Sequence, residues 1–143
     1  MADAKVLLVD DEEEFTEVLA ARLRNRDLDV STAANGLEAL KLAEQTTFDA
    51  VVLDMRMPEM DGLETLQKLL EINPDLQVIL LTGHGSLPDG VQAIKMGAMD
   101  FLEKPADINK LMEKIQQAKE NMDNLSDQKL EDRIGDILKK KGW

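Results

Sequence analysis

The chain contains no cysteine, so it can form no disulfide, no thiol nucleophile and no thiolate-bound metal site. The absence of thiols fits a reducing compartment, and we expect a cytoplasmic protein. No apolar run approaches the roughly 20 residues that a membrane-spanning helix needs, and the first residues lack the pattern of a secretory signal. We therefore expect no membrane partner.

Positive charge is also scarce, since 17 basic residues against 29 acidic ones give a net charge of −12. Unaided binding to DNA or RNA depends on Lys and Arg that neutralise phosphates. We therefore expect no direct nucleic-acid partner. With 143 residues, of which 43% are hydrophobic, the chain is long enough for one domain with a substantial core.

The most informative stretch is the apolar run Ala50–Leu53, which leads directly into Asp54. A continuous apolar run of this length is typical of a strand buried on both faces of a parallel sheet. Pro58 and Asp61-Gly62 predict a turn just beyond it. Asp54 would then lie at the edge where open α/β sheets bind ligands. Taken alone, the residue fits equally well an acid that merely ends a strand.

Four further segments are predicted to be strands. Two are continuous apolar runs and belong in the centre of the sheet, whereas two are weaker and belong at its edges. The strands are expected at Lys5–Val9, Leu28–Thr32, Val78–Leu81 and Met99–Leu102.

Helical spacing of apolar residues predicts five helices between and after these strands, around residues 15–23, 37–43, 63–70, 88–94 and 108–115. The alternation predicts an α/β fold, a doubly wound five-stranded parallel sheet of the flavodoxin-like kind with helices on both faces. By analogy with other doubly wound proteins, the expected strand order is 2-1-3-4-5.

Polar residues stand where these strands end: Asp10 and Asp11, Asp54, Thr82 and Lys104. The carboxyl ends of parallel strands meet at one edge of the sheet, so these side chains should converge. Three neighbouring carboxylates repel one another unless a cation lies between them, and a hard divalent ion such as Mg²⁺ suits oxygen ligands. One carboxylate could then attack phosphorus, while a lysine and a hydroxyl contact the phosphoryl oxygens. The plainer interpretation is a turn threonine and a solvated surface lysine.

The chain resembles the receiver domain of two-component response regulators from about Lys5 to about Met122, and we expect that domain over residues 1–122. The resemblance depends on four motifs that follow one another in the family's order. They are Val9-Asp10-Asp11, Leu53 to Gly62, Thr82-Gly83-His84-Gly85, and Gly97 to Pro105.

This resemblance implies that Asp54 is the phosphoacceptor and takes its phosphoryl group from a sensor histidine kinase or phosphotransfer protein. It implies that Asp11, Asp54 and the backbone carbonyl of Arg56 bind Mg²⁺ or Mn²⁺, with Asp10 acting mostly through water. The domain would be a signalling switch in a phosphorelay, acting on an unknown downstream protein. It would not be an enzyme, although it would assist its own phosphorylation and dephosphorylation.

The resemblance further implies that Thr82 and Lys104 contact the phosphoryl group and that Thr82 and Phe101 form the switch. Many receivers carry Tyr at the position of Phe101, so switching here would act through packing alone. Ala106 stands where Phe often follows Lys-Pro, which leaves the packing of the fifth helix open. His84 is expected to be a loop residue near the site and not a catalyst.

Residues 123–143 are predicted to be a polar linker over Asp123–Asp127 followed by an amphipathic helix over Ser126–Lys140, with Ser126 as its cap. One helix is too short for a helix-turn-helix, so no output domain is expected. The alternative is a frayed linker. The helix would dock on the protein's own fifth helix or on a second copy of the chain, as a homodimer, through Leu130, Ile134, Ile137 and Leu138.

Two other function classes fit the same fold. A flavodoxin-like redox carrier would need a loop rich in Gly, Ser or Thr after the first strand, whereas this chain has Asp10 to Glu14, five acids in a row. A degenerate receiver would bind partners without phosphorylation, and the intact acids, Thr82 and Lys104 argue against it.

Overall fold

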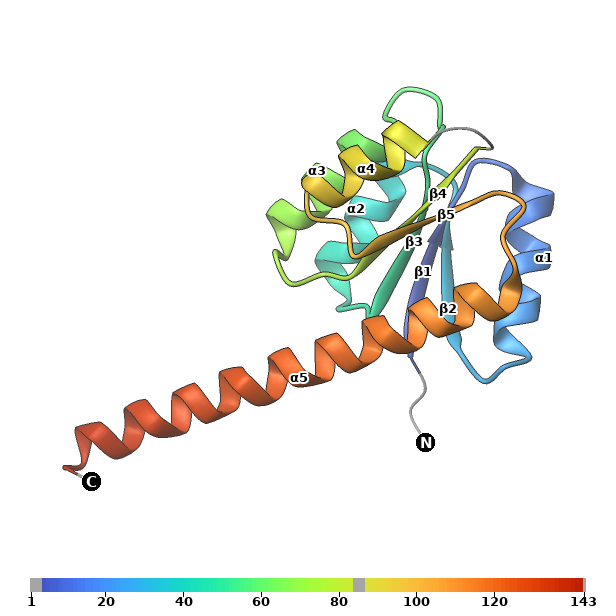
Figure 1. The fold of residues 1–143 in the computed structure, drawn as a ribbon. Coiled ribbons are helices and arrows are strands. Elements are labelled where there is room, and N and C mark those ends of the chain that lie inside the picture. Colours follow the sequence, from blue (N-terminus) through green and yellow to red (C-terminus); the bar gives the residue numbers. More distant parts are fainter. Residues whose placement is uncertain (1–3, 84–86, 143) are drawn as a thin grey trace.

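The structure of the protein is a computed structural model that describes residues 4–83 and 87–142. Its five strands form one parallel sheet in the order β2-β1-β3-β4-β5 (Figure 1). The continuous apolar runs form the central strands, and the two weaker segments form the edges, as the sequence predicts. The strands are β1 (Lys5–Val9), β2 (Asp29–Ala33), β3 (Ala50–Asp54), β4 (Val78–Thr82) and β5 (Asp100–Glu103).

Five helices alternate with the strands. They are α1 (Glu13–Arg24), α2 (Gly36–Gln45), α3 (Gly62–Ile72), α4 (Leu87–Lys95) and α5 (Ile108–Lys140). Three of them begin at side-chain caps. Asn35, Asp61 and Asp107 each accept a hydrogen bond from a backbone N–H in the first turn of α2, α3 and α5, respectively. None of the helices in the described ranges is long and apolar enough to cross a membrane.

The sheet has a separate hydrophobic layer on each face. Side chains alternate along a strand, so Leu7 and Val9 pack on one face with α2, α3 and α4, whereas Val6 and Leu8 pack on the other with α1 and α5. All five residues of β3 and of β4 are buried. Burial on both faces explains why these strands are continuous apolar runs, and it confirms the doubly wound α/β fold.

The predicted linker over Asp123–Asp127 is wrong, because α5 continues through it without interruption to Lys140. The segment is polar but contains neither Gly nor Pro, so nothing stops the helix. Lys119 and Asp123 pair along the helix at 3.6 Å, and Gln128 and Asp132 are hydrogen-bonded at 3.0 Å. A hydrophilic composition alone does not distinguish a linker from the exposed part of a long helix.

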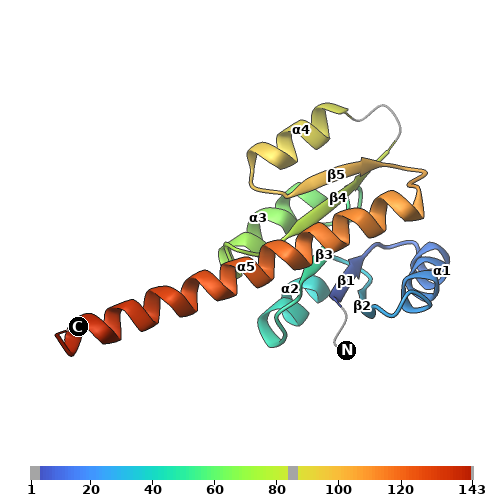
Figure 2. The ribbon, with the colours of Figure 1, turned by 60° about the horizontal axis from the view of Figure 1, so that its bottom comes forward.

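The prediction that a tail helix docks on the protein's own fifth helix is therefore wrong as well, since both belong to one straight helix. Met122 is the last buried residue of α5, and Lys129 makes a further contact with Asp75 across the end of the sheet. Beyond that point α5 projects away from the sheet (Figures 1 and 2). Its apolar side chains Leu130, Ile134, Ile137 and Leu138 are 44–58% exposed.

Candidate functional site

Three carboxylates meet at the carboxyl edge of the sheet. Asp10 and Asp11 follow the last residue of β1, and Asp54 is the last residue of β3. One carboxylate oxygen from each lies within 4.8 Å of the other two. Asp10 and Asp54 are buried, whereas Asp11 is exposed to solvent. The predicted convergence of the three acids is therefore confirmed.

Lys104 bridges two of these carboxylates. Its Nζ lies 3.0 Å from Oδ1 of Asp54 and 3.2 Å from Oδ2 of Asp10. Its backbone N–H donates to the carbonyl of Thr82 at 2.7 Å, which ties the end of β5 to the end of β4. A residue distant in the sequence is thus placed among the acids by strand pairing, and Lys104 is not a solvated surface charge.

The local fold also fixes the orientation of Asp10. Its Oδ1 accepts a hydrogen bond from the backbone N–H of Glu12 at 2.9 Å, just before α1 begins. Its Oδ2 faces Lys104. Both oxygens of this buried carboxylate therefore have a partner, as a buried charge requires.

Burial and the neighbouring charges together shift the pKa values of Asp54 and Lys104. Burial raises the pKa of Asp54; the hydrogen bond from Lys104 opposes that effect, and the negative charges of Asp10 and Asp11 add to it. The pKa of Lys104 is also raised: burial acts to lower it, but the hydrogen bond and charge of Asp54, together with Asp10, outweigh burial. One lysine facing three acids leaves the site short of positive charge.

Asp10, Asp11 and Asp54 could together bind a metal ion. Their donors are all carboxylate oxygens, which suits a hard divalent cation. Burial, together with the charges of Asp10 and Asp11, raises the pKa of Asp54 despite the hydrogen bond from Lys104. The exposure of Asp11 leaves the cluster open to solvent. Arg56, whose carbonyl is a further predicted ligand, lies two residues beyond β3, and its role stays a prediction.

The two predicted switch residues lie on β4 and β5. Thr82 is fully buried, and its hydroxyl donates to the carbonyl of Leu102 at 3.4 Å. Phe101 is half-buried and packs against α4 so closely that a Cβ built on Gly90 would lie 2.5 Å from the ring. Thr82 is therefore held toward β5 and Phe101 toward α4. Their switching roles stay predictions, and His84 lies outside the described residues.

Phe15 also lies at the site, although the sequence places it only in the helical pattern over residues 15–23. The Nζ of Lys104 lies 4.7 Å from the centroid of the Phe15 ring. Helical spacing indicates that Phe15 faces inward, but it does not indicate which distant side chain it meets. No sequence signal would have identified the contact.

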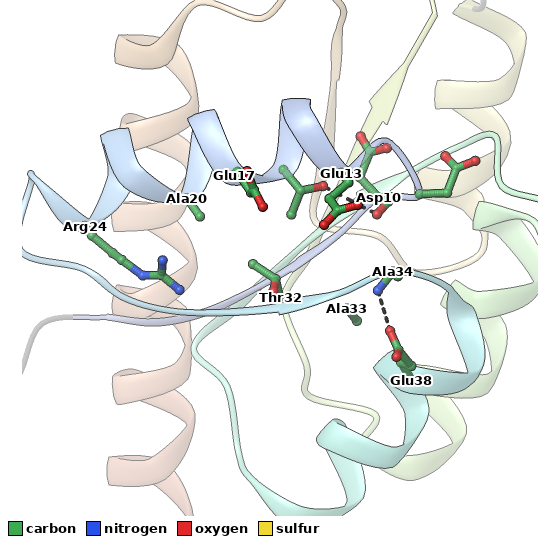
Figure 3. Close-up of a pocket in the computed structure, with 11 residues that line it drawn as sticks. Asp10, Glu13, Glu17, Ala20, Arg24, Thr32, Ala33, Ala34 and Glu38 are labelled. Atoms are coloured by element: carbon green, nitrogen blue, oxygen red, sulfur yellow. Dashed lines mark hydrogen bonds between the residues drawn. The ribbon is translucent and has the colours of Figure 1, made fainter.

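A groove of about 430 Å³ runs from Asp10 between α1 and the β2 edge (Figure 3). Glu13, Glu17 and Glu38 line it, and Arg24 lies at its far end. Glu38 is engaged locally, since it accepts a hydrogen bond from the backbone N–H of Ala34 at 2.6 Å. The groove extends the negative field of the carboxylate cluster along α1.

Comparison with known proteins gives a family. The family model described as the response regulator receiver domain matches residues 6–116. The chain is 41% identical over 113 residues to the transcriptional regulatory protein ZraR of Klebsiella oxytoca, a match that covers 79% of this chain and 26% of that protein. The chain spans less than a third of the curated relatives it matches.

Solved structures agree. A response regulator receiver domain protein from Clostridium thermocellum superposes with a TM-score of 0.83 at 33% identity, covering 86% of this chain and 99% of that one. A response regulator from Burkholderia pseudomallei, solved with a phosphorylated aspartic acid, a calcium ion and citrate, gives a TM-score of 0.74 at 33% identity. That match covers 90% of this chain and 75% of the other.

The expectation that nucleic acid plays no part conflicts with these findings, because the curated relatives are named transcriptional regulatory proteins. The net charge of −12 is that of these 143 residues, which cover less than a third of those relatives. The expectation of no nucleic-acid partner is therefore withdrawn.

The raised pKa of Asp54 generates the first prediction. A carboxyl whose folded-state pKa lies above its ordinary value of 3.8 destabilises the fold once it ionises. This cost is absent below pH 3.8, grows as the pH rises through the folded-state pKa, and is then constant. In EDTA at pH 7, Asp54→Asn should therefore have a higher free energy of unfolding than wild type, and the difference should shrink toward pH 3.8.

Urea unfolding followed by circular dichroism measures this difference. Asp136→Asn, on the exposed part of α5, removes the same formal charge away from the cluster and should leave stability nearly unchanged. A wild type that is more stable than Asp54→Asn at pH 7 without metal would contradict the raised pKa of Asp54.

Proposed function

Because this chain belongs to the response regulator receiver domain family, we propose that Asp54 accepts a phosphoryl group from a sensor histidine kinase or phosphotransfer protein. Phosphorylation then switches the binding of a downstream protein in a phosphorelay. The observation that carries the proposal is the site itself: Asp54, the lysine 3.0 Å from it and two further acids lie at one sheet edge. The cytoplasmic location expected from the sequence stays a prediction.

In this mechanism an oxygen of Asp54 attacks the phosphorus of the donor. A new O–P bond forms as the bond from phosphorus to the donor's leaving atom breaks, and the donor keeps that electron pair. Lys104, which lies 3.0 Å from the attacking carboxylate of Asp54, neutralises charge on the phosphoryl oxygens. The ionised form of Asp54 is the nucleophile, so its raised pKa must not keep it protonated under working conditions.

A divalent ion, Mg²⁺ or Mn²⁺, would be held by Asp11, Asp54 and the carbonyl of Arg56, with Asp10 contributing mostly through water. Such an ion neutralises the acids and the developing phosphoryl charge. The Burkholderia relative, which contains both a phosphorylated aspartic acid and a calcium ion, supports this pairing by analogy. The domain would thereby assist its own phosphorylation and dephosphorylation while remaining a signalling domain and not an enzyme.

The switch would connect the site to α4. The hydroxyl of Thr82 is held by one long hydrogen bond to Leu102, so a phosphoryl oxygen could compete for it. If Thr82 turned toward the phosphoryl group, Phe101 could move into the space it leaves and release its contact with Gly90. Phe101 has no hydroxyl, so its coupling to α4 must be steric. Coupling of this kind is typically worth about 1–3 kcal/mol.

The competing functions are less well supported. A flavin phosphate would meet Asp10, Asp11 and the acids of the neighbouring groove, which repel it. A degenerate receiver would have no use for a buried lysine–aspartate pair at the sheet edge, since such a pair is costly to bury. Phosphorylation is the property that separates these alternatives.

The second prediction is that acetyl phosphate, a small phosphodonor, phosphorylates the wild-type chain only with Mg²⁺ or a similar ion. Intact-mass spectrometry should show one added phosphoryl group, lost in EDTA and in Asp54→Asn. Asp100→Asn removes an acid paired with Lys114 outside the cluster and should be phosphorylated normally. A phosphorylated Asp54→Asn protein would show that another residue is the acceptor.

The third prediction tests the switch. Thr82→Ala should still accept the phosphoryl group, but its phosphorylation should shift the amide NMR signals of α4 much less than in wild type. Gly90→Ala should instead move the α4 signals before any phosphorylation, because the added Cβ meets the Phe101 ring at 2.5 Å. Phosphorylation shifts on α4 that are equal in Thr82→Ala and wild type would exclude this route.

A second copy of the chain is the partner that fits the exposed end of α5. Leu130, Ile134 and Ile137 are spaced four and three residues apart, the spacing of a two-stranded coiled-coil seam. From Met122 to Trp143 the charges balance at five acids and five bases, so two such helices need not repel. Each buried side chain contributes roughly 1.5–3 kcal/mol before entropy costs.

The fourth prediction follows from this pairing. Sedimentation equilibrium should show a concentration-dependent dimer for wild type and a monomer for the double variant Ile134→Lys/Ile137→Lys. Val18→Lys changes a similarly exposed apolar residue on α1 and should leave the dimer intact. A wild type that sediments as a monomer at about millimolar concentration would exclude the homodimer.

A further inference from the structure

Lys104 has a third neighbour besides its two carboxylates. Its Nζ lies over the ring of Phe15 at 4.7 Å from the centroid, within the roughly 6 Å at which an ammonium is attracted to an aromatic face. Phe15 comes from α1 and is half-buried. The lysine is therefore enclosed between the acids on one side and an aromatic ring on another.

The ring contact differs from the carboxylate contacts in one respect. Asp10 and Asp54, which Lys104 touches, are also two of the three candidate metal ligands. A divalent cation among these acids would compete with the ammonium for the same oxygens and would repel it. The Phe15 ring is not a metal ligand, so its attraction for Lys104 would persist.

Without the ring contact, only the carboxylates would hold the Lys104 ammonium at the site. Its side chain is 23% exposed, and a lysine released from its carboxylates can extend into water on a flexible four-carbon stem. Phe15 offers the ammonium a place at the site that does not depend on the acids. Within residues 4–83 and 87–142, no other aromatic ring contacts the Lys104 ammonium.

We propose that Phe15 is a positioning residue: its ring face holds the Lys104 ammonium at the carboxylate cluster, so that the lysine stays available to an incoming phosphoryl group. The inference rests on the proposed function, because it assigns Phe15 a part in phosphorylation of Asp54. It adds to the site a residue that the family's motifs do not contain.

The plainer alternative is that Phe15 only packs. With Val18, Leu19 and Ala106 it lines a small apolar groove of about 100 Å³ between α1 and the start of α5. A packing role would be met by any apolar side chain of similar size. A role for the ring face would be met only by another aromatic residue, and this difference can be tested.

The experiment compares Phe15→Leu, Phe15→Tyr and a control, Val18→Ala, which alters the same groove away from Lys104. Acetyl phosphate with Mg²⁺ is the donor, so the docking of a protein partner does not affect the measured rate. Phe15→Leu should slow phosphorylation of Asp54 by roughly three- to tenfold, the loss expected for one cation–π contact. Phe15→Tyr and Val18→Ala should stay within about twofold of wild type.

A second readout needs neither metal nor phosphorylation. Acylation of Lys104 by acetic anhydride in EDTA, followed by peptide mass spectrometry, should be several-fold faster in Phe15→Leu and unchanged in Phe15→Tyr and Val18→Ala. If Phe15→Leu does not fold, fluorinated phenylalanines at position 15 replace it, since they retain size while weakening the ring's attraction for a cation. Phosphorylation should then slow, and acylation accelerate, with each added fluorine.

The outcomes separate the two proposals. A wild type that is not phosphorylated, with Lys104 still protected by Phe15, would overturn the proposed function. A wild type that is phosphorylated, with Phe15→Leu or the fluorinated series matching it in both readouts, would overturn the positioning role. Equal slowing by Phe15→Leu and Phe15→Tyr would also overturn it, because an aromatic ring would then not suffice.

Discussion

The bridge from Lys104 to Asp54 and Asp10 is the interaction on which the rest of the site depends. Parallel pairing of β1 with β3 forces the acids at their ends together, and two of these acids are buried. Their repulsion would otherwise oppose the very pairing that forms the centre of the sheet. One lysine reduces that repulsion but cannot cancel three negative charges. The three acids therefore keep an excess of negative charge, which the proposed divalent cation would offset.

The fold and the positions of the acids could be predicted because one constraint determines both. A strand buried on both faces must be apolar along its whole length, so the first acid after such a run marks the carboxyl edge of the sheet. Asp10 and Asp54 are placed by that rule without any knowledge of tertiary contacts. The weaker edge strands were predicted to within one residue, since β2 and β5 are covered less completely and their boundaries leave a fainter pattern. Lys104 could be placed at the edge only once the five strands were assigned in order.

Two features could not be predicted from the sequence. One is the continuation of α5 through a polar segment, and the other is a contact that depends on how a helix is oriented. Polar residues between Met122 and Leu130 look like a linker, yet a helix with a solvated surface has the same composition, and only Gly, Pro or a tertiary contact would have ended it. The meeting of Phe15 and Lys104 depends on how α1 is placed against the segment after β5, which no local pattern encodes. In both cases the local residues allow the observed structure without selecting it.

The pairing of β4 with β5, which places Lys104 at the site, also connects the site to α4. The backbone hydrogen bond from Lys104 to Thr82 is short, at 2.7 Å, and continues the parallel ladder in which Thr82 lies opposite Glu103. The side-chain bond from Thr82 to Leu102 is long, at 3.4 Å, and is weak by the usual criteria. The backbone of Thr82 is thus held more firmly than its side chain. In the proposed switch, a phosphoryl group on Asp54 would compete for the Thr82 hydroxyl and not for the backbone ladder. Phe101 packs directly against Gly90 of α4, so a movement of the Phe101 ring would change the packing of α4. Ladder hydrogen bonds hold the backbones of β4 and β5, whereas one long hydrogen bond holds the Thr82 hydroxyl and packing against α4 holds the Phe101 ring.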